Sequence, residues 1–158
     1  ADIICVAGGT GLAAVYQIAR DFGTNDKPAH IFAGARTANR LYFIEDCKDI
    51  AQVTTATDDG TSGFKGRVTD ALADYLAELS PEALSKLWFY NCGPAPMIHA
   101  AEKVQRDFGA DQQIFSAIDY TTKCGVGICG ACASPDGRRI CIDGPFINRE
   151  PDLLPRLG

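Results

Sequence analysis

The chain has 158 residues, seven cysteines and a formal net charge of −5 at pH 7. A chain of this length can bury one full core plus a small appendage, and its negative charge argues against nucleic acid as a partner. No apolar run approaches the roughly 20 residues that span a membrane, and no signal-peptide pattern opens the sequence. We therefore expect a cytoplasmic protein with Cys5, Cys47 and Cys92 as free thiols.

The first two residues, Ala1 and Asp2, are followed at once by an apolar run, without an initiator methionine or a leader. Such an abrupt start is typical of a chain cut at a domain boundary. We therefore expect the sequence to be a piece of a longer protein.

Strands and helices alternate along residues 1–117. Apolar runs of strand length predict five buried parallel strands, at Ile3–Ala7, Ile31–Ala33, Val53–Ala56, Leu87–Tyr90 and near Gln113–Ile118. Helical spacing predicts one helix with Val15, Ile18, Ala19 and Phe22 on one face, further helices over Asn39–Asp46, Val68–Leu79 and Met97–Phe108, and a short turn started by Ser80 and Pro81. This alternation predicts an α/β fold, a five-stranded parallel Rossmann-like sheet flanked by helices.

The helical pattern stops near Ile118, where a cysteine-rich segment begins. Its spacing, C-x4-C-x2-C-x8-C, opens as the plant-type ligand pattern of a [2Fe–2S] cluster. The predicted ligands are Cys124, Cys129, Cys132 and Cys141. Glycines between them let the backbone approach the sulfur atoms closely. We therefore divide the chain into a nucleotide-binding domain at residues 1–117 and a small cluster-binding domain at residues 118–158.

A turn at Pro135–Gly137 predicts a hairpin in this small domain, with short strands at Ala133–Ser134 and Arg139–Ile142. Two other kinds of cysteine site compete with the cluster. A structural zinc site usually has paired C-x2–4-C hooks, and only Cys129 and Cys132 form one. A disulfide framework needs an oxidising compartment, of which the sequence gives no other sign. The spacing favours the cluster.

A glycine-rich loop, Gly8-Gly9-Thr10-Gly11, lies between the first strand and the first helix. Residues 9–14 fit the G-x-G-x-x-A form of the dinucleotide-binding fingerprint. Such a loop lets a pyrophosphate approach a helix N-terminus, where unpaired N–H groups and the helix dipole favour an anion. The alternative is a plain strand-to-helix turn, because a lone match to this pattern is a weak signal.

The residues that choose between NAD and NADP give opposing signals. The acidic residue usual about 20 positions after the glycine loop is absent, and the second strand ends in Gly34-Ala35-Arg36. Thr57, Asp58 and Asp59 end the third strand, where a carboxylate can bind ribose hydroxyls and would repel a 2′-phosphate. Arg36 can accommodate that phosphate. We expect NAD(H) rather than NADP(H), with a solvated turn as the alternative role of the two aspartates.

The fourth strand closes with Cys92-Gly93-Pro94, and Met97 follows shortly after. The Gly-Pro step predicts a sharp turn at the carboxyl edge of the sheet, where α/β folds bind ligands. Cys92 either lines a nicotinamide pocket there or is a small buried residue. His30 and His99 are assigned no role, and we predict no catalytic side chain, because no triad or metal-hydrolase constellation is visible.

These motifs, in this order, resemble the electron-transfer (iron–sulfur) subunit of dihydroorotate dehydrogenase B, within the ferredoxin–NADP reductase superfamily. The resemblance covers nearly the whole chain. It is carried by Gly8–Leu12, Gly34–Thr37, Thr57–Gly63 with Gly66 and Val68–Asp70, Cys92–Pro94 with Met97, and Lys123–Cys132 continuing to Cys141–Pro145.

The resemblance implies an oxidoreductase subunit in which NAD(H) on the first domain exchanges a hydride with FAD. The flavin then exchanges single electrons with the [2Fe–2S] cluster. It also implies that FAD lies on an N-terminal β-barrel missing from this chain, so that the fragment alone is inactive. The implied partner is an FMN-containing catalytic subunit of pyrimidine biosynthesis, in a hetero-oligomer.

The chain departs from this family at two places. Relatives often carry proline at the position of Ala14 and Val-Phe at that of Phe146-Ile147, and the second difference concerns the docked partner.

Two alternative functions stay open. Similar subunits occur in bifurcating NADH–ferredoxin transhydrogenases and in sulfhydrogenases. From another class, a nucleotide-sensing regulatory protein with a structural zinc knuckle also fits. Our first interpretation is an electron-transfer module. It needs a flavin, because NADH gives two electrons as a hydride, a [2Fe–2S] cluster accepts one, and no residue of this chain can divide the pair.

Overall fold

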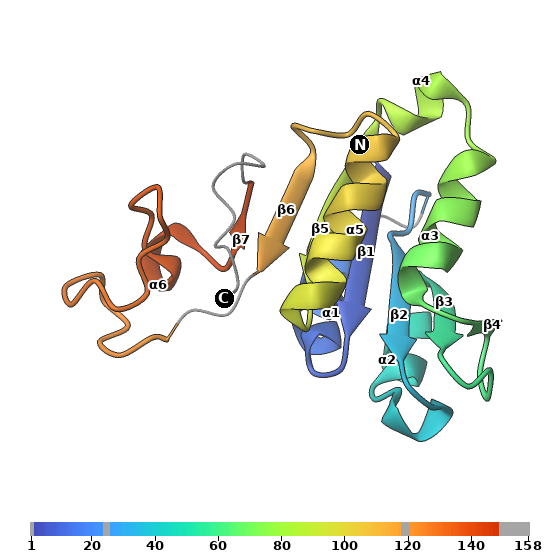
Figure 1. The fold of residues 1–158 in the computed structure, drawn as a ribbon, viewed down its shortest axis with the longest axis horizontal. Coiled ribbons are helices and arrows are strands. Elements are labelled where there is room, and N and C mark those ends of the chain that lie inside the picture. The colour runs from blue at the N-terminus through green and yellow to red at the C-terminus, as the bar shows by residue number, and fades with distance from the viewer. Residues whose placement is uncertain (1, 24–25, 118–120, 149–158) are drawn as a thin grey trace.

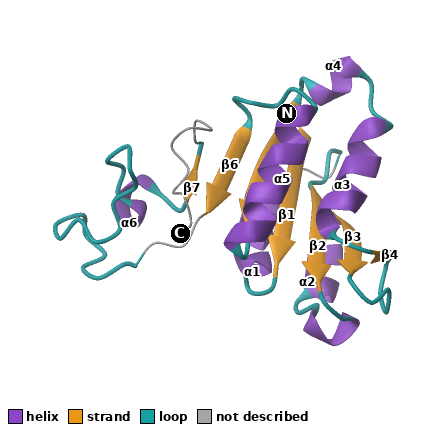
Figure 2. Ribbon diagram, in the orientation of Figure 1, coloured by secondary structure: helices purple, strands orange, loops and turns teal. Residues whose placement is uncertain are grey.

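The computed structural model describes residues 2–23, 26–117 and 121–148. One sheet organises them, with the strand order β4-β3-β2-β1-β5-β6-β7 (Figures 1 and 2). All neighbouring strands pair in parallel except β6 and β7, which are antiparallel. The strands are β1 (Asp2–Gly8), β2 (His30–Ala35), β3 (Gln52–Thr57), β4 (Phe64–Lys65), β5 (Leu87–Cys92), β6 (Ile114–Ala117) and β7 (Phe146–Ile147).

Helices cover both faces of the sheet, with α3 and α5 on one face and α1 and α2 on the other (Figure 1). None of the helices in the described ranges is both long enough and apolar enough to cross a bilayer. Their bounds are α1 (Gly11–Phe22), a 3-10 turn (Ala38–Arg40), α2 (Ile44–Lys48), α3 (Val68–Ala77), α4 (Pro81–Leu84), α5 (Ala95–Asp107) and α6 (Ile140–Asp143).

Strand β1 shows why the central strands read as continuous apolar runs. Its side chains alternate between two cores, since successive residues of a strand point to opposite faces. Ile4 and Val6 pack with α3 and α5, whereas Cys5 and Ala7 pack with α1 and α2, and all four are buried. A parallel strand covered on both faces has no polar side.

The five predicted parallel strands are confirmed, but the sheet has seven strands rather than five. The two extra strands, β4 and β7, have two residues each and are too short to leave a periodic pattern. The helix predicted at Asn39–Asp46 is replaced by the 3-10 turn and α2, which are separated around Phe43 at a φ of 64°. Phe22 is exposed rather than part of the buried face of α1.

The start of α4 is as predicted. The Ser80 hydroxyl accepts a hydrogen bond from the Ala83 N–H at 3.2 Å, and Pro81 takes the first helical position. This cap satisfies one of the backbone N–H groups that a helix N-terminus leaves without an intrahelical partner.

The predicted hairpin of the cysteine-rich segment is only partly present. A turn does form at its tip, where Gly137 N donates to Ser134 O at 2.9 Å, and Ala133 pairs with Arg139 in an isolated antiparallel bridge. In place of a second strand, the chain forms the single turn of α6. The Asp143 carboxylate accepts a hydrogen bond from the Arg139 N–H and so stabilises that helical turn against extended backbone.

The predicted domain boundary at Ile118 lies outside the described residues. Beyond it, β7 returns to the sheet and pairs with β6, with Ile147 opposite Ser116. The cysteine-rich segment lies past this edge, at the end of the sheet opposite β4 (Figure 1). The division into two domains stays a prediction.

Candidate functional site

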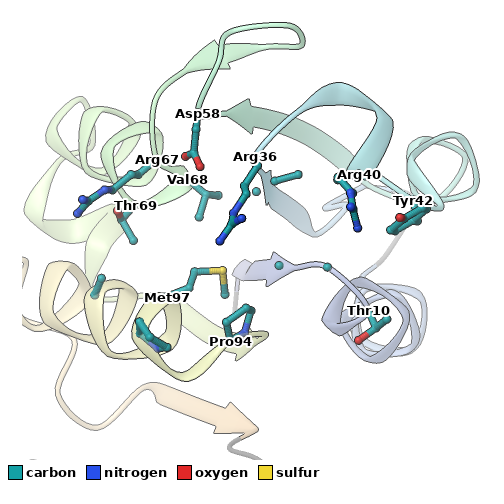
Figure 3. Close-up of a pocket in the computed structure, with 16 residues that line it drawn as sticks. Thr10, Arg36, Arg40, Tyr42, Asp58, Arg67, Val68, Thr69, Pro94 and Met97 are labelled. Atoms are coloured by element: carbon teal, nitrogen blue, oxygen red, sulfur yellow. The ribbon is translucent and has the colours of Figure 1, made fainter.

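A cavity of about 880 Å³ opens at the carboxyl ends of the central strands (Figure 3). Residues at the ends of β1 and β2 and just after β3 and β5 line it. In parallel α/β sheets this edge is the usual place for a ligand. The predicted nucleotide-binding residues that line the cavity are Gly8, Gly9, Thr10, Arg36, Asp58, Pro94 and Met97.

The glycine loop packs directly on the turn between β5 and α5. A Cβ at Gly8 would lie 2.7 Å from Met97 Sδ, and a Cβ at Gly11 would lie 2.3 Å from the Cys92 carbonyl oxygen. A larger residue at Gly11 would therefore push the two loops apart, whereas one at Gly8 would displace the Met97 side chain. Thr10 is the N-cap of α1 and its side chain makes no capping bond. The loop thus presents the start of a twelve-residue helix to the cavity, an arrangement that suits a pyrophosphate.

Five predicted nucleotide-binding residues, Gly11, Thr57, Asp59, Cys92 and Gly93, lie outside the cavity lining. Thr57 is buried; its hydroxyl donates to Ser62 O at 2.9 Å and accepts from Ser62 N at 3.0 Å. These bonds shape the loop that follows β3. The backbone of Cys92 and Gly93 packs against that of the glycine loop.

The two neighbouring aspartates have different roles. Asp59 Oδ1 accepts hydrogen bonds from the Thr61 hydroxyl at 2.6 Å and from Thr61 N at 3.0 Å. These two bonds lower the pKa of Asp59, and the bond from the hydroxyl has the larger effect. Asp58 is the aspartate that lines the cavity. Asp59 therefore has the bonding of a turn residue, whereas the binding of a ribose by Asp58 stays a prediction.

Several lining residues were not among those predicted from the sequence. Arg40 and Tyr42 come from the segment after β2, while Arg67 and Thr69 lie at the start of α3. Arg36, Arg40 and Arg67 are spread along the cavity (Figure 3). The three arginines could have been predicted from their place in the sequence, because each closely follows a strand that ends at the edge of the cavity.

Backbone N–H groups of the cysteine-rich segment point at its sulfur atoms. Cys129 N donates to Cys124 Sγ at 3.5 Å, and Gly127 N donates to Cys141 Sγ at 3.2 Å. Ala131 N donates to Cys129 Sγ at 3.5 Å. N–H groups aimed at sulfur stabilise the thiolate, the form in which cysteine binds metal.

The pKa values distinguish two motif cysteines, Cys124 and Cys132, from the core cysteines. A backbone hydrogen bond from Cys141 lowers the pKa of Cys132, while the side-chain hydrogen bond with Cys132 raises that of Cys141. The N–H of Cys129, with smaller contributions from those of Val126 and Ile128, lowers the pKa of Cys124 to about 6. In contrast, burial raises the pKa of Cys5, and it raises the pKa of Cys47 to about 11. At neutral pH the core cysteines are thiols, whereas Cys124 is largely a thiolate.

The four predicted ligands also contact one another in pairs. The side chain of Cys124 contacts that of Cys129, and the side chain of Cys132 contacts that of Cys141. In the described part of the chain, no three His, Cys, Asp or Glu side chains are arranged to hold a single metal ion. Four sulfur donors on one short segment, with N–H groups on the sulfur atoms, fit the all-thiolate ligand set of an iron–sulfur cluster.

Two family models match different parts of the chain. Residues 5–103 match the oxidoreductase NAD-binding domain. The chain belongs to this family. Residues 121–151 match the iron–sulfur cluster binding domain of dihydroorotate dehydrogenase B. The two family matches confirm the predicted NAD and iron–sulfur cofactors at the level of the family.

Curated relatives extend the likeness over almost the whole chain. This chain is 34% identical to a protein of Methanocella arvoryzae described as "Probable dihydroorotate dehydrogenase B (NAD(+)), electron transfer subunit". The match covers 99% of this chain and 59% of the relative. A homologue of the same subunit from Thermotoga maritima is 32% identical, over 99% of this chain and 56% of its own. The resemblance to this subunit is confirmed, and the chain spans a little over half the length of these relatives.

Solved structures support the same fold. A structure described under "Insights into flavin-based electron bifurcation via the NADH-dependent reduced ferredoxin-NADP oxidoreductase structure" matches with a TM-score of 0.78 and 29% identity. That match covers 99% of this chain and 56% of the other. The ferredoxin reductase in carbazole 1,9a-dioxygenase matches with a TM-score of 0.56 and 28% identity, over 68% of this chain and 34% of the other. Both structures share the fold of this chain over the matched regions.

Proposed function

We propose that this chain passes electrons between a nicotinamide dinucleotide, by way of FAD, and a [2Fe–2S] cluster, and on to a partner oxidoreductase such as dihydroorotate dehydrogenase. Electrons can flow in either direction. One observation carries the proposal: a dinucleotide-type cavity and a four-cysteine segment with thiolate-stabilising N–H groups occur in one chain.

The cavity binds and orients the nucleotide. Gly9 and Thr10, at the start of α1, take the pyrophosphate, and Asp58 accepts hydrogen bonds from a ribose. Pro94 and Met97 form an apolar wall at the β5 side, which suits the nicotinamide ring and excludes water from it. The chain's own contribution is therefore placement of the ring at the open edge of the sheet.

A flavin supplies the exchange between a hydride and single electrons. We place FAD on a part of the protein that the longer relatives have in addition to the matched region. Hydride transfer needs the reacting atoms at roughly 3–3.5 Å, so that flavin must close over the Pro94–Met97 wall. The partner subunit, the hetero-oligomer and the cytoplasmic location belong to the same proposal.

Cys124, Cys129, Cys132 and Cys141 would hold the cluster, which stores one electron when bound. Their backbone N–H partners offset part of the negative charge that builds up on the sulfur atoms. Val126, Ile128 and Ile142 are exposed on the same segment, and we assign this apolar rim to the contact with the electron-transfer partner. A place in a bifurcating enzyme is the second candidate, favoured by the structural match of TM-score 0.78.

Metal analysis with visible absorption spectroscopy tests the proposal against a zinc-knuckle protein. We expect a brown protein with about two irons per chain after anaerobic reconstitution. A colourless protein with one zinc per chain, under the same iron-rich conditions, would overturn the electron-transfer function. It would support the nucleotide-sensing alternative instead.

A further inference from the structure

Gly127 lies between the first two predicted cluster ligands and contacts the fourth. Its N–H donates to Cys141 Sγ at 3.2 Å. Its backbone is left-handed, at a φ of 74°, and a Cβ there would lie 2.7 Å from Ile142 Cδ1. The other two glycines of the ligand segment, Gly125 and Gly130, have open space at the corresponding position. Gly127 therefore packs closely against the residues around the fourth ligand.

The side chain of Arg139 makes a further contact with Gly127. Arg139 Nη1 donates a hydrogen bond to Gly127 O. The guanidinium group thus bonds to a backbone carbonyl, and within the ranges that the structure describes it forms no ion pair with a carboxylate. Its neighbour Arg138 differs, because that side chain pairs with Asp136 and donates to Asn148 O at 2.8 Å. Of the two adjacent arginines, Arg139 is the one that reaches the loop between the ligands.

The backbone of Arg139 is held by the turn that carries the fourth ligand. Arg139 is the N-cap of α6, and its N–H donates to the Asp143 carboxylate. Its carbonyl oxygen accepts hydrogen bonds from Ile142 N at 2.9 Å and from Asp143 N at 2.8 Å. Cys141 lies within α6. The Arg139 side chain therefore joins the loop of the first two ligands to the turn of the fourth.

A hydrogen bond to a ligand sulfur affects the reduction potential of a cluster. Reduction adds negative charge to the cluster and its thiolates, and an N–H group on sulfur stabilises that charge. The bond is effective only while its geometry is kept, because hydrogen bonds weaken steeply when they are misaligned. Glycine has the freest backbone of all residues, so the N–H of Gly127 needs a restraint from outside the loop. The bond from Arg139 to Gly127 O supplies one.

We propose that Arg139 is a positioning residue for the [2Fe–2S] cluster: it holds Gly127 O, keeps the Gly127 N–H on Cys141 Sγ, and so raises the reduction potential of the cluster. The inference rests on the cluster of the proposed function and adds to it a residue that is not a ligand. Arginine suits this task because its guanidinium group is a rigid fork of donors that stays charged.

Redox titration of the iron-reconstituted chain, followed by visible absorption, measures the reduction potential of the cluster. Arg139→Gln should keep about two irons per chain, since it removes no ligand. The equilibrium constant for its one-electron reduction should fall about threefold to tenfold, the size expected from one hydrogen bond, and a tenfold fall is about 59 mV. Arg139→Lys should lie between the two, because lysine keeps the charge but not the fork of donors. Arg138→Gln removes the same formal charge from the neighbouring residue, and this matched control should leave the potential unchanged.

Salt separates the positioning role from a direct effect of the guanidinium charge. An attraction between an exposed guanidinium group and the reduced cluster would be screened at about 1 M salt, where the Debye length is about 3 Å. Positioning through Gly127 does not depend on that attraction. The difference in potential between wild type and Arg139→Gln should therefore persist from about 0.1 M to about 1 M sodium chloride.

The outcomes distinguish this inference from the proposed function. A wild-type chain that takes up no iron overturns the cluster itself, and with it the proposed function. Equal potentials in iron-loaded wild type and Arg139→Gln overturn the positioning role and leave the cluster intact. An equal shift in Arg138→Gln, or a difference that vanishes at high salt, overturns that role as well. If Arg139→Gln does not load iron, Arg139→Lys decides: a lowered potential supports the role, and a wild-type potential overturns it.

Discussion

The surroundings of individual cysteines in this chain set their pKa values. Cys5 and Cys47 lie in the core between the sheet and α1 and α2, where burial raises their pKa values. Cys124 is exposed, and backbone N–H groups lower its pKa. Cysteine binds metal as the thiolate, so the surroundings favour Cys124 as a ligand over Cys5 and Cys47, in agreement with the spacing.

Serine substitution of each cysteine should therefore give two classes of variant. Cys124→Ser, Cys129→Ser, Cys132→Ser and Cys141→Ser should lose iron and visible absorption, because serine oxygen is a poor replacement for thiolate. Cys47→Ser is the matched control, since Cys47 is buried and outside the motif, and it should keep its iron. Full iron content in Cys132→Ser would contradict the ligand assignment, as would iron loss in Cys47→Ser.

His30 makes stability depend on pH. Its Nε2 lies 2.8 Å from the Thr54 hydroxyl, and its ring packs 4.2 Å from that of Phe32 and 4.9 Å from that of Tyr75. Burial lowers the pKa of His30 from 6.5 to about 4. The unfolded chain therefore binds an extra proton between these values. This contribution to stability is complete above pH 6.5 and is lost as the pH falls toward 4, by at most about 3 kcal/mol.

Urea unfolding of wild type and His30→Gln between pH 4 and 7 measures this effect. Glutamine can still bond to Thr54 but does not titrate. The free energy of unfolding of the variant should fall less steeply with decreasing pH than that of wild type. Parallel curves would show that folding does not lower the pKa of His30.

At the scale of elements, a buried polar network joins α5 to the end of the sheet. The Ser116 hydroxyl on β6 donates to Glu102 Oε1 at 2.5 Å, and Asn91 on β5 bonds to Gln105 and Ser116. Arg106 lies 3.6 Å from Glu102 Oε2. Because Asn91 precedes the Cys92–Pro94 turn, the network fixes the wall of the cavity as well as the helix.

Glu102→Ala should lower the free energy of unfolding by about 2–4 kcal/mol, since it leaves buried partners without an acceptor. Glu45→Ala is the matched control; Glu45 pairs with Lys48 on an exposed helix and should contribute less than about 1 kcal/mol. Urea midpoints at pH 7 compare the two. Equal, small losses would show that the network does not hold α5 to the sheet.

The sequence predicts elements well where burial imposes a pattern. The strand at Ile3–Ala7 is recognisable because both of its faces are covered. Strands β4 and β7 are not, because two residues have no period. The turn of α6 depends on a bond from Arg139 to Asp143 that outweighs the strand preference of its apolar residues. Local hydrogen bonds of this kind compete with extended structure.

The candidate site was predictable to a similar extent. The glycine loop and the cysteine spacing are contiguous motifs, so the sequence shows them directly. Arg40 and Arg67 lie far apart in the sequence and line one cavity because β2, β3 and β4 end side by side. The separation of Asp58 from Asp59 depends on a hydroxyl two residues away, at Thr61. Which of these residues line the cavity therefore depends on tertiary structure, which the sequence pattern does not show.

At the scale of the whole molecule, the nucleotide cavity and the cysteine-rich segment occupy different regions of one sheet. The cavity lies at the carboxyl ends of the central strands, and the cysteines lie beyond β6 and β7 (Figure 1). No side chain between the two sites can convert a hydride, which carries two electrons, into single-electron transfers. Electron transfer between the two sites therefore needs a flavin from another part of the protein, and the 158 residues alone should not carry it out.

Anaerobic mixing of the oxidised, cluster-loaded chain with NADPH or NADH, followed by visible absorption, tests this requirement most directly. The cluster should stay oxidised with either nucleotide, and dithionite should then bleach it, which shows that it is intact and reducible. The longer protein with bound FAD should bleach on the same addition of nucleotide. Rapid bleaching of the chain without flavin would contradict the account, and so would a flavin-loaded protein whose cluster neither nucleotide reduces.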